Sequence, residues 1–69
     1  MEENLTLLKP KNPTKISDHE FERKKKLLRV KTPDNIIEIG ERAFENCINL
    51  EYIKLADTVK YIGSHAFYD

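Results

Sequence analysis

Apolar positions along this chain recur at an interval of 23 residues. Residues 39–44 read Ile-Gly-Glu-Arg-Ala-Phe, and residues 62–67 repeat the pattern as Ile-Gly-Ser-His-Ala-Phe. Overlaying 27–46 on 50–69 gives seven identical positions in twenty, most of them glycine or apolar. A period of about 20–50 residues is typical of repeat architectures, in which each unit buries its apolar face against its neighbours. The pattern therefore predicts a stack of similar coils.

A more degenerate copy of the same pattern precedes these two repeats. In residues 4–26, Leu7 falls beneath Val30 in the 23-residue frame. The three phenylalanines of the chain are evenly spaced, at Phe21, Phe44 and Phe67. We expect residues 1–26 to be a degenerate N-terminal capping repeat, and residues 27–69 to hold one full and one truncated repeat.

Each regular repeat contains the same predicted elements. Residues 27–32 alternate apolar and polar side chains and favour a strand, as do 50–55. A turn containing Asp follows each strand, since Asp and Asn bond their own backbone. A second extended segment then returns at 36–40 and at 59–63.

Helical structure is predicted for the rest of each repeat. Ser17 and Glu20 have the spacing of a capping box, in which the hydroxyl accepts from the Glu20 amide and the carboxylate reaches back. A helix from about residue 18 to 28 is expected to follow. Shorter helical turns are expected at 41–46 and 64–69, where they direct Ala and Phe inward.

The residues shared between repeats form the predicted core. For its two glycines, a backbone conformation that a Cβ would penalise and a close approach between coils are both open explanations. The predicted core comprises Phe21, Leu27, Val30, Ile39, Gly40, Ala43, Phe44, Cys47, Leu50, Ile53, Ile62, Gly63, Ala66 and Phe67.

The pattern Leu-x-x-Ile-x-Leu-x-Asp-x-Val-x-x-Ile-Gly-x-x-Ala-Phe resembles the repeat of the BspA-like (Treponema-type) leucine-rich repeat family. The family unit has 23 residues and a cysteine at the position of Cys47. The resemblance implies an α/β fold: a short right-handed solenoid with a parallel strand ladder on one face and short helical turns on the other. Departures in the first copy, which suggest a cap, are Asn4, Ser17, Glu20 and Lys24.

The resemblance also implies a broad role. Members of this family are chiefly surface or secreted proteins that bind host proteins or other cells. A protein partner is therefore expected, with a cell-surface or secreted location, although the N-terminal residues lack the pattern of a secretory signal. Because the chain stops one residue short of the equivalent of Cys47, we expect it to be a fragment of a longer protein.

Composition narrows the choice of partner. The 69 residues are 35% charged with a formal net charge of zero, so no global field selects nucleic acid. No apolar run approaches the roughly 20 residues that span a bilayer, and membrane insertion is not expected. Residues 1–35 carry nine Lys and Arg against six Asp and Glu, whereas 36–69 carry three against six.

Candidate chemistry is sparse. Cys47 occupies an inward apolar position and His65 an outward one, so thiol catalysis is not expected. Neither histidine has zinc-site spacing to Cys47, so no metal site and no cofactor are predicted. The basic run at 23–26 is interpreted as a solvated helix face rather than a phosphate contact. The chain is therefore predicted to be non-enzymatic.

The outward strand positions are the best candidates for binding. Arg29 and Lys31 in one coil, and Tyr52 and Lys54 in the next, would form one basic and aromatic surface. Tyr and Arg are over-represented at binding hot spots. The first hypothesis is therefore a protein-interaction module that uses this face. The alternative is a structural segment that self-associates end to end through exposed coil ends, forming a homo-oligomer.

Overall fold

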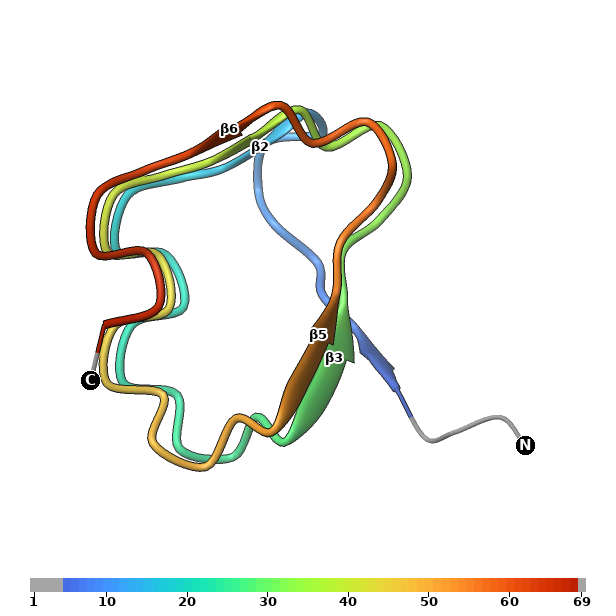
Figure 1. The fold of residues 1–69 in the computed structure, drawn as a ribbon. Helices are drawn as coiled ribbons and strands as arrows, with labels where there is room; N and C mark the ends of the chain where they lie inside the picture. The colour runs from blue at the N-terminus through green and yellow to red at the C-terminus, as the bar shows by residue number, and fades with distance from the viewer. Residues whose placement is uncertain (1–4, 69) are drawn as a thin grey trace.

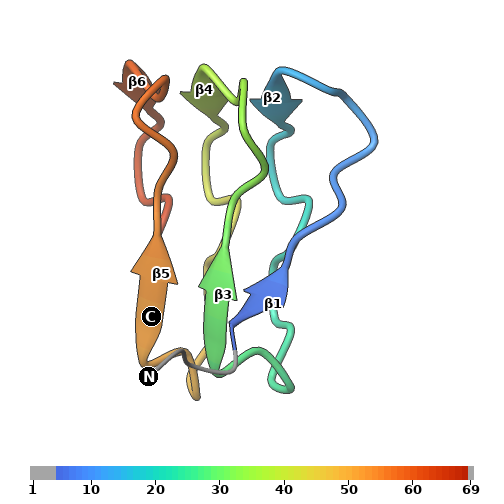
Figure 2. The same cartoon turned by 90° about the vertical axis from the view of Figure 1, so that its right-hand side faces the viewer.

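A computed structural model describes residues 5–68, and these residues form three stacked turns of chain (Figure 1). We call them coil 1 (5–26), coil 2 (27–49) and coil 3 (50–68). In Figure 1 the three coils overlie one another, and in Figure 2 they stand side by side. Successive copies of the repeat therefore lie directly on one another.

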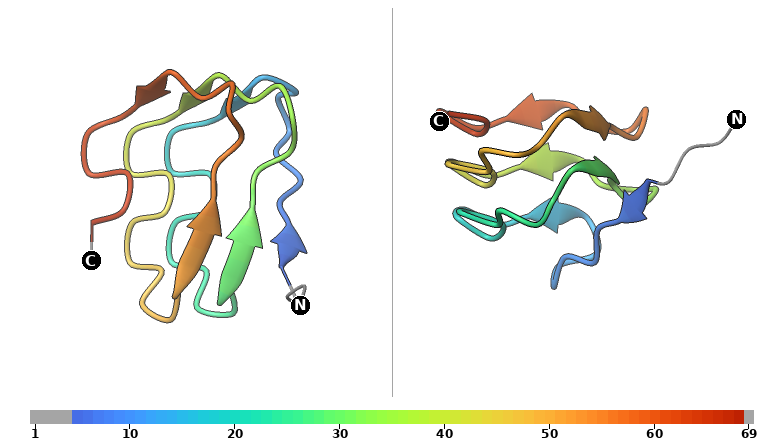
Figure 3. Two further views of the ribbon diagram at one scale, coloured as in Figure 1. Left: turned by 45° about the vertical axis from the view of Figure 1, so that its right-hand side comes forward. Right: turned by 90° about the horizontal axis from the view of Figure 1, so that it is seen from below.

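Each coil contributes one strand to each of two parallel sheets. The first sheet has the order β1-β3-β5, formed by Thr6–Leu7, Arg29–Lys31 and Tyr52–Lys54. The second has the order β2-β4-β6, formed by Lys15–Ile16, Glu38–Ile39 and Tyr61–Ile62. The predicted strand ladder is therefore confirmed, and Figure 3 shows both sheets within one stack.

The predicted helix at 18–28 is wrong, since none of residues 5–68 is helical. His19 and Arg23 have φ angles of 62° and 64°, in the left-handed region that an α-helix of L-residues does not use. The N–H groups of His19, Phe21 and Arg23 donate to coil 2 at 3.0, 2.9 and 2.8 Å rather than along their own segment. Bonds between coils thus replace the bonds of a helix.

The helical turns expected at 41–46 and 64–69 are also absent among the described residues. Arg42, Asn46 and His65 have φ angles of 58°, 61° and 58°. The N–H groups of Arg42, Phe44 and Asn46 donate to coil 3 at 3.0, 2.7 and 2.7 Å. Residues 5–68 also contain no helix long and apolar enough to cross a membrane.

The register of coil 1 differs from the 23-residue frame by one residue. Strand β1 pairs Thr6 with Val30 and Leu7 with Lys31, whereas β2 pairs Ile16 with Ile39. Coil 1 therefore has one extra residue between its two strands. Because side chains alternate across a sheet, Leu7 is 46% exposed instead of buried beneath Val30.

The two glycines allow adjacent coils to approach one another closely. Neither has a positive φ angle. A Cβ on Gly40 would lie 2.6 Å from the backbone N of Asp18, and one on Gly63 would lie 2.6 Å from that of Glu41. Of the two explanations for these glycines, the structure therefore supports the close approach between coils.

The phenylalanines form a continuous stack through the coils. Ring centroids of Phe21 and Phe44 lie 5.5 Å apart and those of Phe44 and Phe67 lie 5.3 Å apart, with nearly parallel planes. The buried apolar residues around this stack are Leu8, Ile16, Val30, Ile36, Ile39, Ala43, Phe44, Cys47 and Ala66. Phe67 and Ile62 are 41% and 52% exposed because no coil follows coil 3 among the described residues.

We predict that Phe44→Ala will unfold the chain. Phe44 is 1% exposed and stacks on both sides, so truncation removes contacts with two coils at once. Phe→Ala substitutions in cores cost about 3–5 kcal/mol, comparable to the whole stability of so small a domain. Far-UV circular dichroism and urea titration measure the loss.

The matched control is Lys25→Ala on the exposed part of coil 1. This change should alter the free energy of unfolding by less than about 0.5 kcal/mol. Near-native melting of the Phe44→Ala chain would contradict the role assigned to the stack.

Candidate functional site

The outward positions of β3 and β5 lie together on one face of the first sheet. The register sets Arg29 opposite Tyr52 and Lys31 opposite Lys54. We call these four residues the strand-face patch. The Arg29 guanidinium carbon is 4.9 Å from the centroid of the Tyr52 ring, a cation–π distance. This contact holds Arg29 and Tyr52 in a defined arrangement.

The two lysines of the patch share a like charge without compensation. Lys31 and Lys54 are exposed and occupy paired positions on strands that lie about 4.8 Å apart. Like charges directly opposite one another in a sheet are destabilising. Neither lysine, nor Arg29, takes part in any ion pair formed within residues 5–68. The patch is therefore a basic surface whose cations form no ion pair within residues 5–68, with the Tyr52 ring beside Arg29.

Leu7 adds an apolar side chain to this surface, although the 23-residue frame aligns it with the buried Val30. It pairs with Lys31 in the register of β1 and β3, so it extends the row formed by Lys31 and Lys54 onto coil 1. Alternation of Leu5, Thr6 and Leu7 is the sequence signal for this strand. That signal cannot give its register, because the extra residue of coil 1 lies further along the chain.

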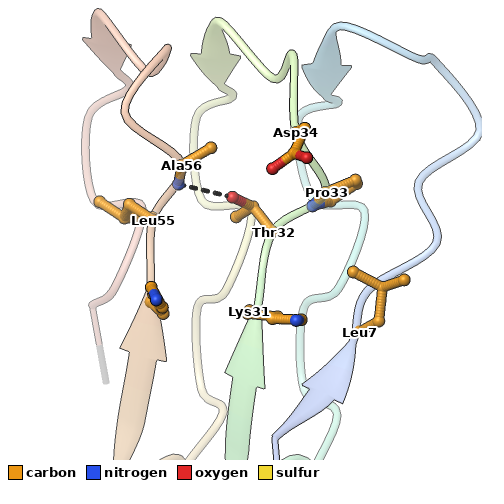
Figure 4. A pocket seen from close by; sticks show the side chains of 8 residues that line it. Leu7, Lys31, Thr32, Pro33, Asp34, Leu55 and Ala56 are labelled. Atoms are coloured by element: carbon orange, nitrogen blue, oxygen red, sulfur yellow. Dashed lines mark hydrogen bonds between the residues drawn. The ribbon is translucent and has the colours of Figure 1, made fainter.

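A shallow hollow of about 310 Å³ adjoins the patch (Figure 4). Its walls are the ends of the strands and the turns after them: Leu7, Lys31, Thr32, Pro33, Asp34, Lys54, Leu55 and Ala56. Thr32 is 5% exposed, and its hydroxyl accepts from the Ala56 amide at 2.9 Å. The hollow thus combines apolar walls with the side chains of two lysines and of Asp34.

Comparison with known proteins agrees with this geometry. A family model described as BspA type leucine rich repeat region (6 copies) matches residues 3–69. The chain belongs to this family. The match includes coil 1, where the repeat is most degenerate in sequence. No curated protein and no solved structure matches the chain.

Leucine-rich-repeat regions generally mediate protein interactions and are generally non-enzymatic. In this leucine-rich-repeat chain, Cys47 and each of the two histidines contact different groups. Cys47 is buried, and its Sγ donates to the backbone oxygen of Phe21 at 3.0 Å. His65 lies on an exposed turn, where its Nδ1 is 2.7 Å from the Ser64 hydroxyl. His19 instead contacts Glu22, with 3.1 Å between Nδ1 and Oε1.

The basic run at 23–26 is exposed, but it lies on turns rather than on a helix face. Its segment is tied to coil 2, because the Asn49 side-chain amide donates to the backbone oxygen of Lys25 at 3.0 Å. These cations lie outside the strand-face patch, and they supply control positions for tests of it.

We predict that Cys47 will resist alkylation in the folded leucine-rich-repeat chain. Burial raises the pKa of its thiol above the ordinary value of 9.0, and the thiolate is the reactive form. Iodoacetamide at pH 8 should modify the folded chain more slowly than the urea-unfolded chain, followed by mass spectrometry. Equal rates would show that the thiol is accessible.

The same shift predicts a loss of stability in alkali. A raised pKa means that the folded chain keeps a proton which the unfolded chain releases. This contribution is fully present below pH 9 and is lost as pH rises through the pKa of the folded state. Urea titrations across this range measure it.

Proposed function

We propose that this leucine-rich-repeat chain is a non-enzymatic protein-interaction module that binds an acidic segment of a protein partner through the strand-face patch. The observation that carries the proposal is the opposed pair Lys31 and Lys54, which has no acidic neighbour in any ion pair of the described residues. A carboxylate placed between them would relieve their repulsion and accept charge-assisted hydrogen bonds.

The aromatic half of the patch would supply the anchor. Tyr52 is 43% exposed, and its ring already contacts Arg29. A side chain held in place before binding loses less conformational entropy when the complex forms. Tyr and Arg are also the residue types that dominate binding hot spots. Leu7 and the adjoining hollow would receive an apolar side chain that flanks the partner's carboxylate.

The proposed module is a segment of a right-handed solenoid, in which residues 1–26 serve as the N-terminal cap. The amides of Gly40 and Gly63 donate to the preceding coil at 2.6 and 2.7 Å. Ser17 holds the equivalent place in coil 1, and its amide donates to the Glu20 carboxylate at 2.8 Å instead. The other oxygen of Glu20 accepts from the Lys11 amide at 2.9 Å. Glu20 thus supplies the bond that a preceding coil would supply.

The test of the binding face is a selection followed by substitution. Peptides from a displayed random library are selected on the folded chain, and their affinities are measured by fluorescence anisotropy. We expect acidic peptides that carry an apolar residue. Replacing Arg29, Lys31, Tyr52 and Lys54 together by Ser should weaken their binding tenfold or more, about 1.4 kcal/mol. Higher salt should also weaken it, because the cations are exposed.

The matched control replaces Lys24, Lys25 and Lys26 by Ser, which removes three exposed cations from another part of the surface. This variant should bind the peptides nearly as well as the unmodified chain. Selected peptides without acidic residues, or equal binding by both variants with native circular dichroism, would refute the site.

A second candidate function is self-association through coil 3. Its outer face exposes Ile62 and Phe67, and no backbone acceptor among residues 5–68 receives the N–H groups of His65 or Phe67. The corresponding end of coil 1 is closed by Glu20. The basic residues 1–35 and the acidic residues 36–69 would favour head-to-tail contact. The closed end of coil 1 and the open face of coil 3 instead favour contact between coil 3 of two copies.

Light scattering over a range of chain concentrations tests this alternative. We expect a dimer at high concentration, and we expect Phe67→Asp to remove it by placing a charge on the exposed face of coil 3. A monomer at millimolar concentration, or a dimer that survives Phe67→Asp, would count against contact through coil 3.

A further inference from the structure

The turns of coils 1 and 2 each carry a pair made of a basic side chain and a glutamate three residues later. In coil 1 the pair is His19 with Glu22, whose Nδ1 and Oε1 atoms lie 3.1 Å apart. In coil 2 it is Arg42 with Glu45, with Nη1 and Oε2 at 2.6 Å. Because positions 23 residues apart stack on one another, the two glutamates occupy neighbouring places in adjacent coils.

This stacking gathers three possible metal ligands. One ligand atom from each of His19, Glu22 and Glu45 lies within 4.8 Å of the other two. Glu45 is buried, Glu22 is half-buried and His19 is exposed, so the group is open to solvent on one side only. The set contains one imidazole and two carboxylates, from two different coils.

We propose that His19, Glu22 and Glu45 bind a zinc ion that links coil 1 to coil 2. Zinc accepts nitrogen and oxygen ligands in tetrahedral geometry, with a water in the fourth position at open sites. Bonds of about 2.0–2.1 Å place two ligands of such an ion roughly 3.3 Å apart. The separation of His19 and Glu22 is close to this value. The remaining adjustment falls on His19, which is exposed, and on Glu22, which is half-buried.

Two acidic side chains meet in this group. Glu22 and Glu45 each place a carboxylate oxygen within 4.8 Å of the other and of a ring nitrogen of His19. Two carboxylates in close proximity repel one another unless a proton or a cation lies between them. A divalent ion removes that repulsion.

Arg42 acts here as a positioning residue. Its Nη1 donates to Oε2 of Glu45, which leaves the other carboxylate oxygen to bind the metal. Partners that fix the orientation of a ligating carboxylate are a regular feature of metal sites. Arg42 also stands in the position that His19 holds in coil 1, so the repeat supplies ligand and positioning residue from one column.

Coil 3 supplies a matched control. His65 continues the column of His19 and has a similar backbone, with φ 58° against 62°. Its neighbour is Tyr68 in place of a glutamate, and the two rings meet edge to face at 5.1 Å. His65 therefore has the exposure and conformation of His19 without the two carboxylates.

The experiment measures zinc-dependent melting of the chelator-treated chain. With zinc at ten times the dissociation constant, the melting temperature should rise by about 5 °C or more. The rise should disappear in His19→Asn and in Glu22→Gln, and it should remain in His65→Asn. Asn tolerates the left-handed backbone at both histidine positions, so the two variants are matched in folding. Calcium should have little effect, because the imidazole favours zinc.

Cobalt substituted for zinc identifies the ligands by absorption. A spectrum without a thiolate charge-transfer band supports nitrogen and oxygen ligation. Such a band would overturn the assignment by implicating Cys47. A melting temperature that zinc leaves unchanged up to millimolar concentration, a rise retained in His19→Asn, or a rise lost in His65→Asn would each overturn it as well.

Discussion

The whole molecule depends on the short, constant distance between adjacent coils. Turn amides such as that of Phe21 donate to the next coil at 2.9 Å, and the Phe rings follow at 5.5 and 5.3 Å. Gly40 and Gly63 make this distance possible, because a Cβ at either position would meet the backbone of the preceding coil. A single coil lacks acceptors for the turn amides that donate to the next coil, and it has no core of its own, so stability arises from stacking.

The same distance creates the surfaces on which function is proposed. Residues far apart in sequence become neighbours when their positions in the repeat match or nearly match. Arg29 meets Tyr52 in this way on the strand face, where partner binding is proposed. Glu22 meets Glu45 in the same way on the turns, where zinc is proposed. Small substitutions within one repeat column therefore change the chemistry of a surface without changing the fold that carries it.

The two ends of the described stack differ in whether a side chain accepts from the backbone N–H groups that no neighbouring coil can bind. In coil 1 the Glu20 carboxylate accepts from the amides of Ser17 and Lys11. Buried or edge amides without partners are costly, so this contact stabilises an end beneath which residues 5–68 place no further coil. Coil 3 instead presents Ile62 and Phe67 to solvent. A glutamate at the place of the repeat's alanine is the substitution that makes the first end different.

The sequence by itself determined the repeat and the alignment of the three phenylalanines, because residues 23 positions apart fall at matching places in successive coils. It also placed the strand-face patch, since alternation fixes which strand residues point outward. Only the tertiary structure decided that the turns are not helical: amides in the turns of coils 1 and 2 donate to the next coil, and residues in all three turns, such as His19, Arg42 and His65, adopt left-handed backbone. It also decided the register of Leu7 and the meeting of Glu22 with Glu45, which depend on contacts between coils that no local pattern records.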